Sequence, residues 1–113
     1  MSLLEPVGKI IMFGSSVAPP RYLICNGSSY SRTTYSALFA VIGTNFGSVD
    51  GSSFNVPDFR GVFPRGWNDT NTNIYNDIDR LSRTALYANG ATGNNVGSYQ
   101  LNAYTNHAHS VPA

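Results

Sequence analysis

Proline and glycine recur so often between residues 54 and 67 that neither a long helix nor a long strand can form there. Pro57 and Pro64 each lack a backbone N–H donor, and each drives the preceding residue toward extended backbone. Gly61 and Gly66 divide the remainder into still shorter pieces. The stretch therefore predicts short extended segments joined by turns, and it restricts the chain to a loop-rich fold.

Two short runs of β-forming residues precede this stretch. Residues 6–13 contain an apolar run and predict a first strand. The proline pair at residues 19–20 predicts a loop, because proline cannot donate to a β-ladder. Residues 22–25 predict a second short strand, which ends at the strong turn dipeptide Asn26–Gly27.

One helix is expected between Ser31 and Gly43. Ser31 is a favourable N-cap, and glycine at position 43 is typical of a helix end. Tyr30 and Tyr35 have the spacing of a hydrophobic staple across the first turn. A helix this short depends on packing for its stability, so Phe39, central on the apolar face, is expected to be buried. That face follows the i, i+3, i+4, i+7 pattern and consists of Tyr35, Leu38, Phe39 and Ile42.

Aromatic residues are expected to have different roles in the two halves of the chain. Those of the first half are predicted to lie in the core or in an interface between chains: Tyr22, Tyr35, Phe39, Phe46, Phe54, Phe59, Phe63 and Trp67. Residues 68–95 contain seven Asn and no sustained periodicity, which predicts a long surface excursion. Tyrosines in such a polar region suit contact with a sugar or a protein, and they suit an ordinary hydrated loop equally well.

The composition argues against several classes of protein. Only 12% of the residues are charged, the formal net charge is +1 and Lys9 is the only lysine, so no nucleic-acid partner is expected. No apolar run approaches the roughly 20 residues of a membrane span, which predicts no membrane insertion. No signal peptide is visible at the N-terminus. The single cysteine, Cys25, excludes an internal disulfide and is expected to be a buried, inert thiol.

Asp58, Arg60 and Arg65 are the charged residues of the proline- and glycine-rich stretch. A general acid–base pair of Asp58 with His107 is conceivable, but no nucleophile elbow, phosphate-binding loop or HExxH motif accompanies it. We expect Asp58 instead to bind turn amides or to form an ion pair with Arg60. The chain is therefore predicted not to be an enzyme.

Several segments carry a more specific signal through their order and spacing. The first group consists of residues 7–13, 18–27, 30–39, 54–61 and 63–66. Together these segments resemble the phage tail collar domain family along most of residues 6–66. The segment 97–109, which ends in His-Ala-His, is similar to the His-x-His segment that often follows the collar in that family.

The resemblance implies an α+β fold, a small irregular collar domain with short strands and one short helix, in a parallel homotrimer with an intertwined C-terminal segment. The collar would occupy residues 5–67. A loop-rich polar region, packed on or between chains, would occupy residues 68–101, and a metal-binding segment residues 102–113. The implied function is a structural and receptor-binding module of a virion tail fibre, which attaches to a polysaccharide or an outer-membrane protein on a bacterial surface. The alternatives are the tip of a non-viral trimeric adhesin on the bacterial cell surface and, less favoured, a tail-associated polysaccharide-degrading enzyme.

His107 and His109 are the only histidines and stand two residues apart. In an extended chain both imidazoles would face the same side, and two ligands are too few for a closed metal site. In the trimer that the resemblance implies, three chains would offer six imidazoles around the threefold axis. Such a shell suits a transition-metal ion, iron or zinc, better than magnesium or calcium. The alternative is an exposed polar pair without a metal.

Overall fold

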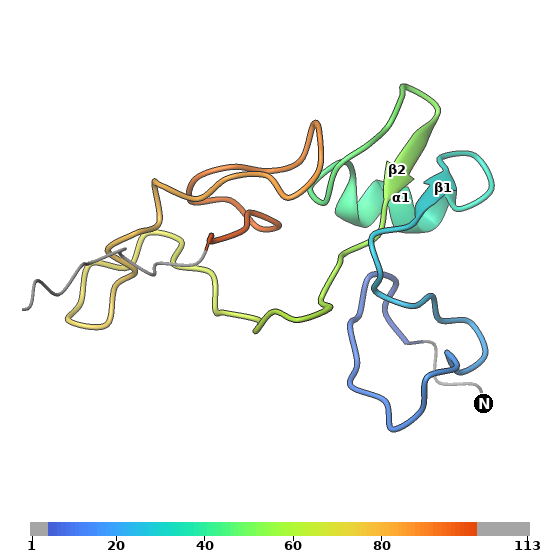
Figure 1. Cartoon of the computed structure of the whole chain (residues 1–113), viewed down its shortest axis with the longest axis horizontal. Coiled ribbons are helices and arrows are strands. Elements are labelled where there is room, and N and C mark those ends of the chain that lie inside the picture. The colour runs from blue at the N-terminus through green and yellow to red at the C-terminus, as the bar shows by residue number, and fades with distance from the viewer. Residues whose placement is uncertain (1–4, 102–113) are drawn as a thin grey trace, which may run out of the picture.

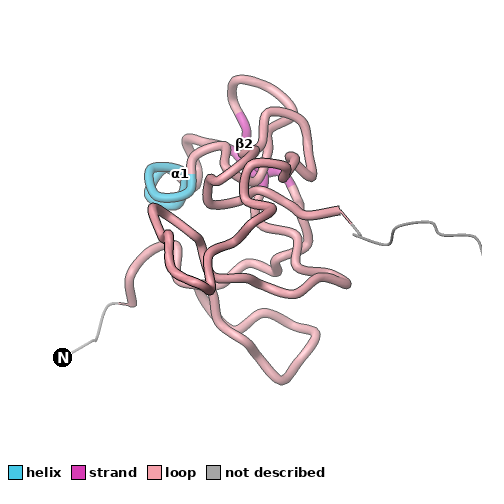
Figure 2. The backbone as a smooth tube through the Cα atoms, turned by 90° about the vertical axis from the view of Figure 1, so that its left-hand side faces the viewer, coloured by secondary structure: helices cyan, strands magenta, loops and turns pink. Residues whose placement is uncertain are grey.

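The computed structural model describes residues 5–101 and shows a small α+β domain, as predicted (Figure 1). Its elements follow the order β1 (Ser29–Ser31), α1 (Ser36–Ile42) and β2 (Ser53–Asn55). Loops and turns make up most of the remaining backbone, which Figure 2 shows in pink. The frequent prolines and glycines are consistent with this low content of regular structure.

The two strands form an antiparallel pair in which Tyr30 lies opposite Phe54. The pairing continues beyond the strands toward the proline- and glycine-rich stretch. Gly27 donates its N–H to the carbonyl of Pro57 at 3.1 Å, and Phe59 donates to the carbonyl of Cys25 at 3.1 Å. Residues 25–31 and 53–59 therefore lie side by side, and this ladder holds the Pro-Asp-Phe-Arg-Gly turn in place.

The strands predicted at residues 6–13 and 22–25 are not observed. Residues 6–13 form a turn, closed by the 3.2 Å hydrogen bond from Lys9 N–H to the Pro6 carbonyl, and then an irregular segment. A β-forming run needs a neighbouring chain segment for its backbone hydrogen bonds, and no part of residues 5–101 pairs with this run. In residues 22–25, only the carbonyl of Cys25 joins the ladder.

The helix begins later than its N-cap signal indicates. The Ser31 hydroxyl accepts hydrogen bonds from the N–H groups of Thr33 and Thr34, both at 3.3 Å, and so caps a turn that precedes α1. The predicted contact between Tyr30 and Tyr35 is confirmed, because their rings meet edge to face with centroids 5.0 Å apart, but it spans the turn before α1 rather than the first turn of the helix. Gly43 ends the helix with a φ of 51°, and its N–H donates to the Phe39 carbonyl at 2.8 Å.

The core of the described chain is small. Phe54 is fully buried and Val56 is 3% exposed, and no other hydrophobic residue in the range 5–101 is buried. Phe39 packs on Phe54 with ring centroids 5.3 Å apart, while the Arg32 guanidinium lies 4.7 Å above the Phe39 ring. The prediction that Phe39 would be buried is wrong: it is only partly covered, and none of the residues of α1 is buried.

Two of the aromatic residues that were predicted to lie in the core or in an interface between chains, Phe63 and Trp67, lie outside the core. Phe63 is almost fully exposed and the Trp67 side chain is more than half exposed. Both follow the last strand, where the chain leaves the domain and enters the polar region. In Figure 1 much of that region, in yellow and orange, lies beside the strands and helix rather than around them. These side chains therefore find little apolar cover among residues 5–101.

Candidate functional site

Asp58 is the centre of a polar anchor between the backbone ladder of residues 25–31 and 53–59 and the polar region. Its carboxylate accepts hydrogen bonds from Arg60 Nε at 2.8 Å and Arg60 Nη2 at 2.7 Å, and from the Arg60 backbone N–H at 3.2 Å. The Tyr87 hydroxyl donates a fourth hydrogen bond at 2.5 Å. The predicted ion pair and turn-amide contact are both confirmed.

These contacts keep Asp58 ionised. Hydrogen bonds from the Arg60 side chain hold the pKa of Asp58 well below its usual range; burial opposes this shift, and the Tyr87 hydroxyl adds to it. The same bond to Asp58 raises the pKa of Tyr87, so the proton stays on the phenol. A carboxylate with so low a pKa is a poor general acid or base near neutral pH. The geometry therefore assigns Asp58 a structural role.

Two glycines make room for Tyr87. Gly27 has a φ of 76°, and a Cβ atom there would lie 2.7 Å from the Tyr87 hydroxyl. Gly47 has a φ of 108°, and its Cβ would lie 2.7 Å from that of Tyr87. Both positions combine positive φ with close approach, which only glycine accommodates without strain. Sequence reasoning predicted the turn at Gly27 but not its contact with a tyrosine sixty positions further along the chain.

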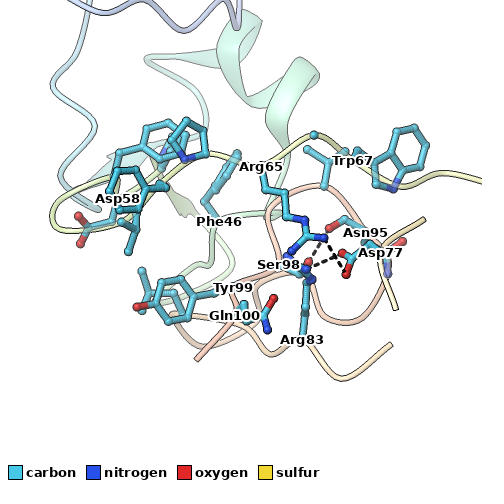
Figure 3. Close-up of a pocket in the computed structure, with 18 of the residues that line it drawn as sticks. Phe46, Asp58, Arg65, Trp67, Asp77, Arg83, Asn95, Ser98, Tyr99 and Gln100 are labelled. Atoms are coloured by element: carbon cyan, nitrogen blue, oxygen red, sulfur yellow. Dashed lines mark hydrogen bonds and ion pairs between the residues drawn. The ribbon is translucent and has the colours of Figure 1, made fainter. Parts of the chain in front are cut away.

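Beside this anchor, an open groove of about 910 Å³ separates the segment after Asp58 from the polar region (Figure 3). One wall is the proline- and glycine-rich stretch from Pro57 to Asn68, and the other comes from residues 83–101. The lining combines apolar rings with amide and charged side chains. Labelled in Figure 3 are Phe46, Asp58, Arg65, Trp67, Asp77, Arg83, Asn95, Ser98, Tyr99 and Gln100.

Arg65 and Arg83 approach the groove from opposite walls and meet at Asp77 (Figure 3). Asp77 is 6% exposed, and the backbone N–H of Asp77 donates a 2.6 Å hydrogen bond to Asn68 Oδ1. Arg83 is nearly buried and forms an ion pair with Asp77, yet its Nε and Nη2 atoms lack an acceptor in hydrogen-bonding geometry. Arg65 is more exposed and lies 3.4 Å from the same carboxylate. The cluster therefore holds two cations and one anion.

Sequence reasoning found only part of this cluster. Arg65 was singled out together with Asp58, but the structure pairs it with Asp77 instead. Asp77 and Arg83 were missed because they lie in a polar region without periodicity or a motif. A charged residue in such a region is ordinarily solvated, so no sequence signal marks these two as buried.

Trp67 stands at the rim of the groove with its ring held in position. Its indole N–H donates to the Asn94 carbonyl at 3.0 Å, while 57% of the residue is exposed. Cys25, predicted to be a buried thiol, is only half-buried, and burial together with the charge of Asp58 raises its pKa. Its low thiolate fraction agrees with the predicted inertness.

The predicted metal ligands, His107 and His109, lie outside the described residues. Within residues 5–101, no group of three or more His, Cys, Asp or Glu side chains is arranged to hold a metal ion. Among the helices in that range, none has the length and apolar character required to cross a membrane.

The fold and the anchor define a class: a small α+β module in which a short ladder and one helix support long structured loops. The comparisons identify the family. Residues 8–64 match the family model of the phage tail collar domain, and the chain belongs to that family. The match covers β1, α1, β2 and Asp58, and membership points to a structural protein; most of the groove's second wall lies beyond it.

Two curated relatives extend over most of the chain. It is 32% identical to the Putative uncharacterized protein StfE of Escherichia coli (strain K12) over 108 residues, which is 96% of this chain and 46% of that protein. It is also 32% identical to Protein RhiB of Rhizobium leguminosarum bv. viciae over 102 residues, which is 84% of this chain and 43% of that protein. The chain thus spans less than half the length of either relative. No solved structure gives a significant match.

Proposed function

We propose that the chain is the distal module of a virion tail fibre, assembled as a parallel homotrimer and attached through its surface to a bacterial cell. Membership of the phage tail collar domain family supports the tail-fibre role. The receptor would be a polysaccharide or an outer-membrane protein of the host. In this role the short ladder, α1 and the Asp58 anchor are the support, and the polar region presents the recognition surface.

The observation that carries the assembly is the contrast between buried and exposed apolar residues. Among residues 5–101, only Phe54 and Val56 are buried hydrophobic residues, whereas six large apolar side chains are more than three-quarters exposed. A soluble domain of this length ordinarily buries more than two hydrophobic side chains in its core. Association of three chains would bury part of it. The six are Met12, Phe63, Ile74, Tyr75, Ile78 and Leu81.

The irregular segment 6–13 supports the same conclusion. It is a β-forming run that has no pairing partner within residues 5–101, and its Val7 and Ile10 side chains are half exposed. A strand that lacks a neighbour in its own chain is satisfied when another chain lies beside it. Assembly would therefore supply both apolar contacts and backbone hydrogen bonds to this segment.

The trimer would also create the metal site. His107 and His109 from three chains would provide six imidazole nitrogens on the threefold axis, a shell that suits iron or zinc. The bound ion would hold the three C-terminal segments together. The ligand set fits the proposed symmetry, because one chain offers only two of the six nitrogens.

Light scattering and a cell-attachment assay test this function. Light scattering should give three times the 12.2 kDa chain mass. Fluorescently labelled protein should attach to some members of a bacterial panel that includes Escherichia and Rhizobium strains, the genera of the curated relatives. A monomer with unchanged fold would contradict the assembly, and failure to attach to any strain would contradict the receptor-binding role.

A further inference from the structure

The groove beside Asp58 has an excess of positive charge. The charge of Asp58 is balanced by Arg60, whereas Asp77 is shared between Arg65 and Arg83. Water does little to stabilise the charge of Arg83, because only 11% of its side chain is exposed. One cationic charge in this cluster therefore lacks a counter-charge among the described residues. An anionic group in the groove would supply it.

Arg65 is the cation that a ligand can reach. Its side chain is 55% exposed, and within residues 5–101 its guanidinium forms no hydrogen bond, only the 3.4 Å ion pair with Asp77. The planar fork of a guanidinium matches the two oxygens of a carboxylate, which it binds through two parallel hydrogen bonds. The position therefore suits an oxyanion that presents two oxygens to this fork, and a carboxylate is such an anion.

The rim of the groove provides a surface for a ring. The hydrogen bond from the Trp67 indole to the Asn94 carbonyl fixes the aromatic plane before any ligand arrives. An aromatic side chain that is already ordered loses little conformational entropy on binding, which favours affinity. The C–H face of a pyranose packs well on such a ring, because both surfaces are flat and apolar.

Polar side chains that suit sugar hydroxyls lie along the same groove. The Asn95 side-chain amide N–H donates a 2.7 Å hydrogen bond to the Thr92 carbonyl, while its Oδ1 atom makes no hydrogen bond within the described range. The Gln100 side chain, also in the lining, makes none there either. Amide groups both donate and accept, which matches the hydroxyl groups of a saccharide.

A peptide strand fits this groove less well. Thr84 and Tyr99 already exchange both of their backbone hydrogen bonds, at 2.9 Å and 2.7 Å. Their pairing is an isolated bridge, so the groove wall offers only a very short edge to which an extended peptide could add. Recognition must come from side chains, and these are an aromatic ring, amides and an available guanidinium.

We propose that this groove binds a carboxylate-bearing saccharide, with a sugar ring on Trp67 and the carboxylate at Arg65. The inference rests on the proposed attachment function and deepens it, because it selects an acidic polysaccharide over an outer-membrane protein as the receptor. The volume of about 910 Å³ falls within the range of small-ligand sites and accommodates a short saccharide segment.

Trp67 is the only tryptophan, so its fluorescence reports directly on the groove. The full chain is titrated with polysialic acid and with glucuronate-containing bacterial capsular polysaccharides. The matched probes are the same polymers after carbodiimide reduction, which converts each carboxylate to a primary alcohol. We expect at least one acidic polymer to change Trp67 emission with saturation, and its reduced form to bind at least tenfold more weakly.

Variants locate the contact. R65Q should weaken binding of the acidic polymer at least tenfold without altering the circular dichroism spectrum, since the side chain lies largely in solvent. R21Q is the matched control, because Arg21 is exposed and lies outside the groove, and it should bind like the parent. The W67A variant lacks the fluorophore, so its binding is measured by calorimetry; it should also bind the acidic polymer more weakly than the parent.

Several results would overturn the proposal. The first is that no acidic polymer changes Trp67 emission. The second is that the reduced polymers bind as tightly as the acidic ones, and the third is that R65Q binds the acidic polymer with the affinity of the parent. Shielding of Trp67 from acrylamide in the assembled protein would also overturn it, by showing that a second copy covers the groove. If labelled protein attaches to cells while the groove fails these tests, the attachment function stands and only the acidic-saccharide site falls. If the titration succeeds but no cells are bound, the attachment function fails instead.

Discussion

The paired region, residues 25–59, and the polar region, residues 68–101, are ordered by different interactions. In the paired region a backbone ladder runs past the fully buried Phe54. In the polar region the only isolated backbone bridge is Thr84 with Tyr99, and side chains bind nearby backbone groups instead. Asn73 Oδ1, for example, accepts from the Tyr75 N–H at 2.7 Å.

The comparison shows how a chain with few charges and a small core can still hold a long loop. Local side-chain hydrogen bonds of Asn, Asp and Ser offer the backbone turn-forming partners, but each contributes little net stability because it replaces a bond to water. The polar region therefore depends on its attachment to the paired region. Its attachments include the Tyr87 contact with Asp58, the bond from Ser48 N–H to the Ala88 carbonyl and the bond from Ala91 N–H to the Asn45 carbonyl.

The largest expected effect comes from removing the buried ring of the paired region. Phe54→Ala should lower the free energy of unfolding by about 3–5 kcal/mol, because it leaves a cavity at the centre of the core. Urea unfolding at several protein concentrations measures the loss.

Phe63→Ala is the control for that measurement, since Phe63 is 97% exposed. Within the chain it should cost less than about 0.5 kcal/mol. Any further loss should vary with protein concentration, because it would come from assembly. An equal, concentration-independent loss for the two variants would contradict the placement of the core at Phe54.

A smaller loss of unfolding free energy should follow from a substitution that separates the paired region from the polar region. A Cβ atom on Gly97, which has a φ of 100°, would lie 2.5 Å from the Asn45 carbonyl oxygen. Gly97→Ala should therefore cost about 1–3 kcal/mol through backbone strain, and it should expose residues 68–101 to protease. Gly51→Ala is the matched control, with no atom within 4 Å of its Cβ, and should be nearly neutral. Equal protease resistance of the two variants would show that the regions are not docked at Gly97.

The Asp58 anchor makes the contact between the regions sensitive to acid. Because Arg60 holds the folded-state pKa of Asp58 below the unfolded value of about 3.9, its contribution to stability is present above that pH. It is lost as the pH falls through the folded-state pKa. Unfolding midpoints measured from pH 7 down to pH 2 should decline less steeply for D58N and R60Q than for the parent. An identical decline in all three proteins would assign the acid sensitivity to other groups.

The smallest effect on the paired region is expected from the C-terminal histidines. In His107→Ala/His109→Ala, elemental analysis should show loss of the proposed ion, about one per three chains in the parent. Metal binding should also weaken below about pH 6.5, since only neutral imidazole is a ligand. The paired region should keep its unfolding free energy, because its core lies within residues 25–59. Metal retained by the double variant would place the site elsewhere.

Much of the fold that depends on local signals was predictable from sequence. The Tyr30–Tyr35 staple, the helix end at Gly43 and the Asp58–Arg60 pair all involve residues within five positions of each other. Their geometry follows from helix periodicity and from the conformational limits of proline and glycine, which act over a few residues. The order of segments was also enough to predict the collar family, which the family match confirms.

Long-range pairing was decided only by the tertiary structure. β1 is a strand because β2 lies beside it, whereas the stronger β-forming run at residues 6–13 has no such neighbour in the described chain. The contact of Tyr87 with Gly27, and the meeting of Arg65 with Arg83 at Asp77, likewise join distant parts of the sequence. Propensity and spacing determine what a segment can form on its own. Burial, pairing and the charge of the groove depend on which segments meet, and that choice rests on packing summed over the whole chain.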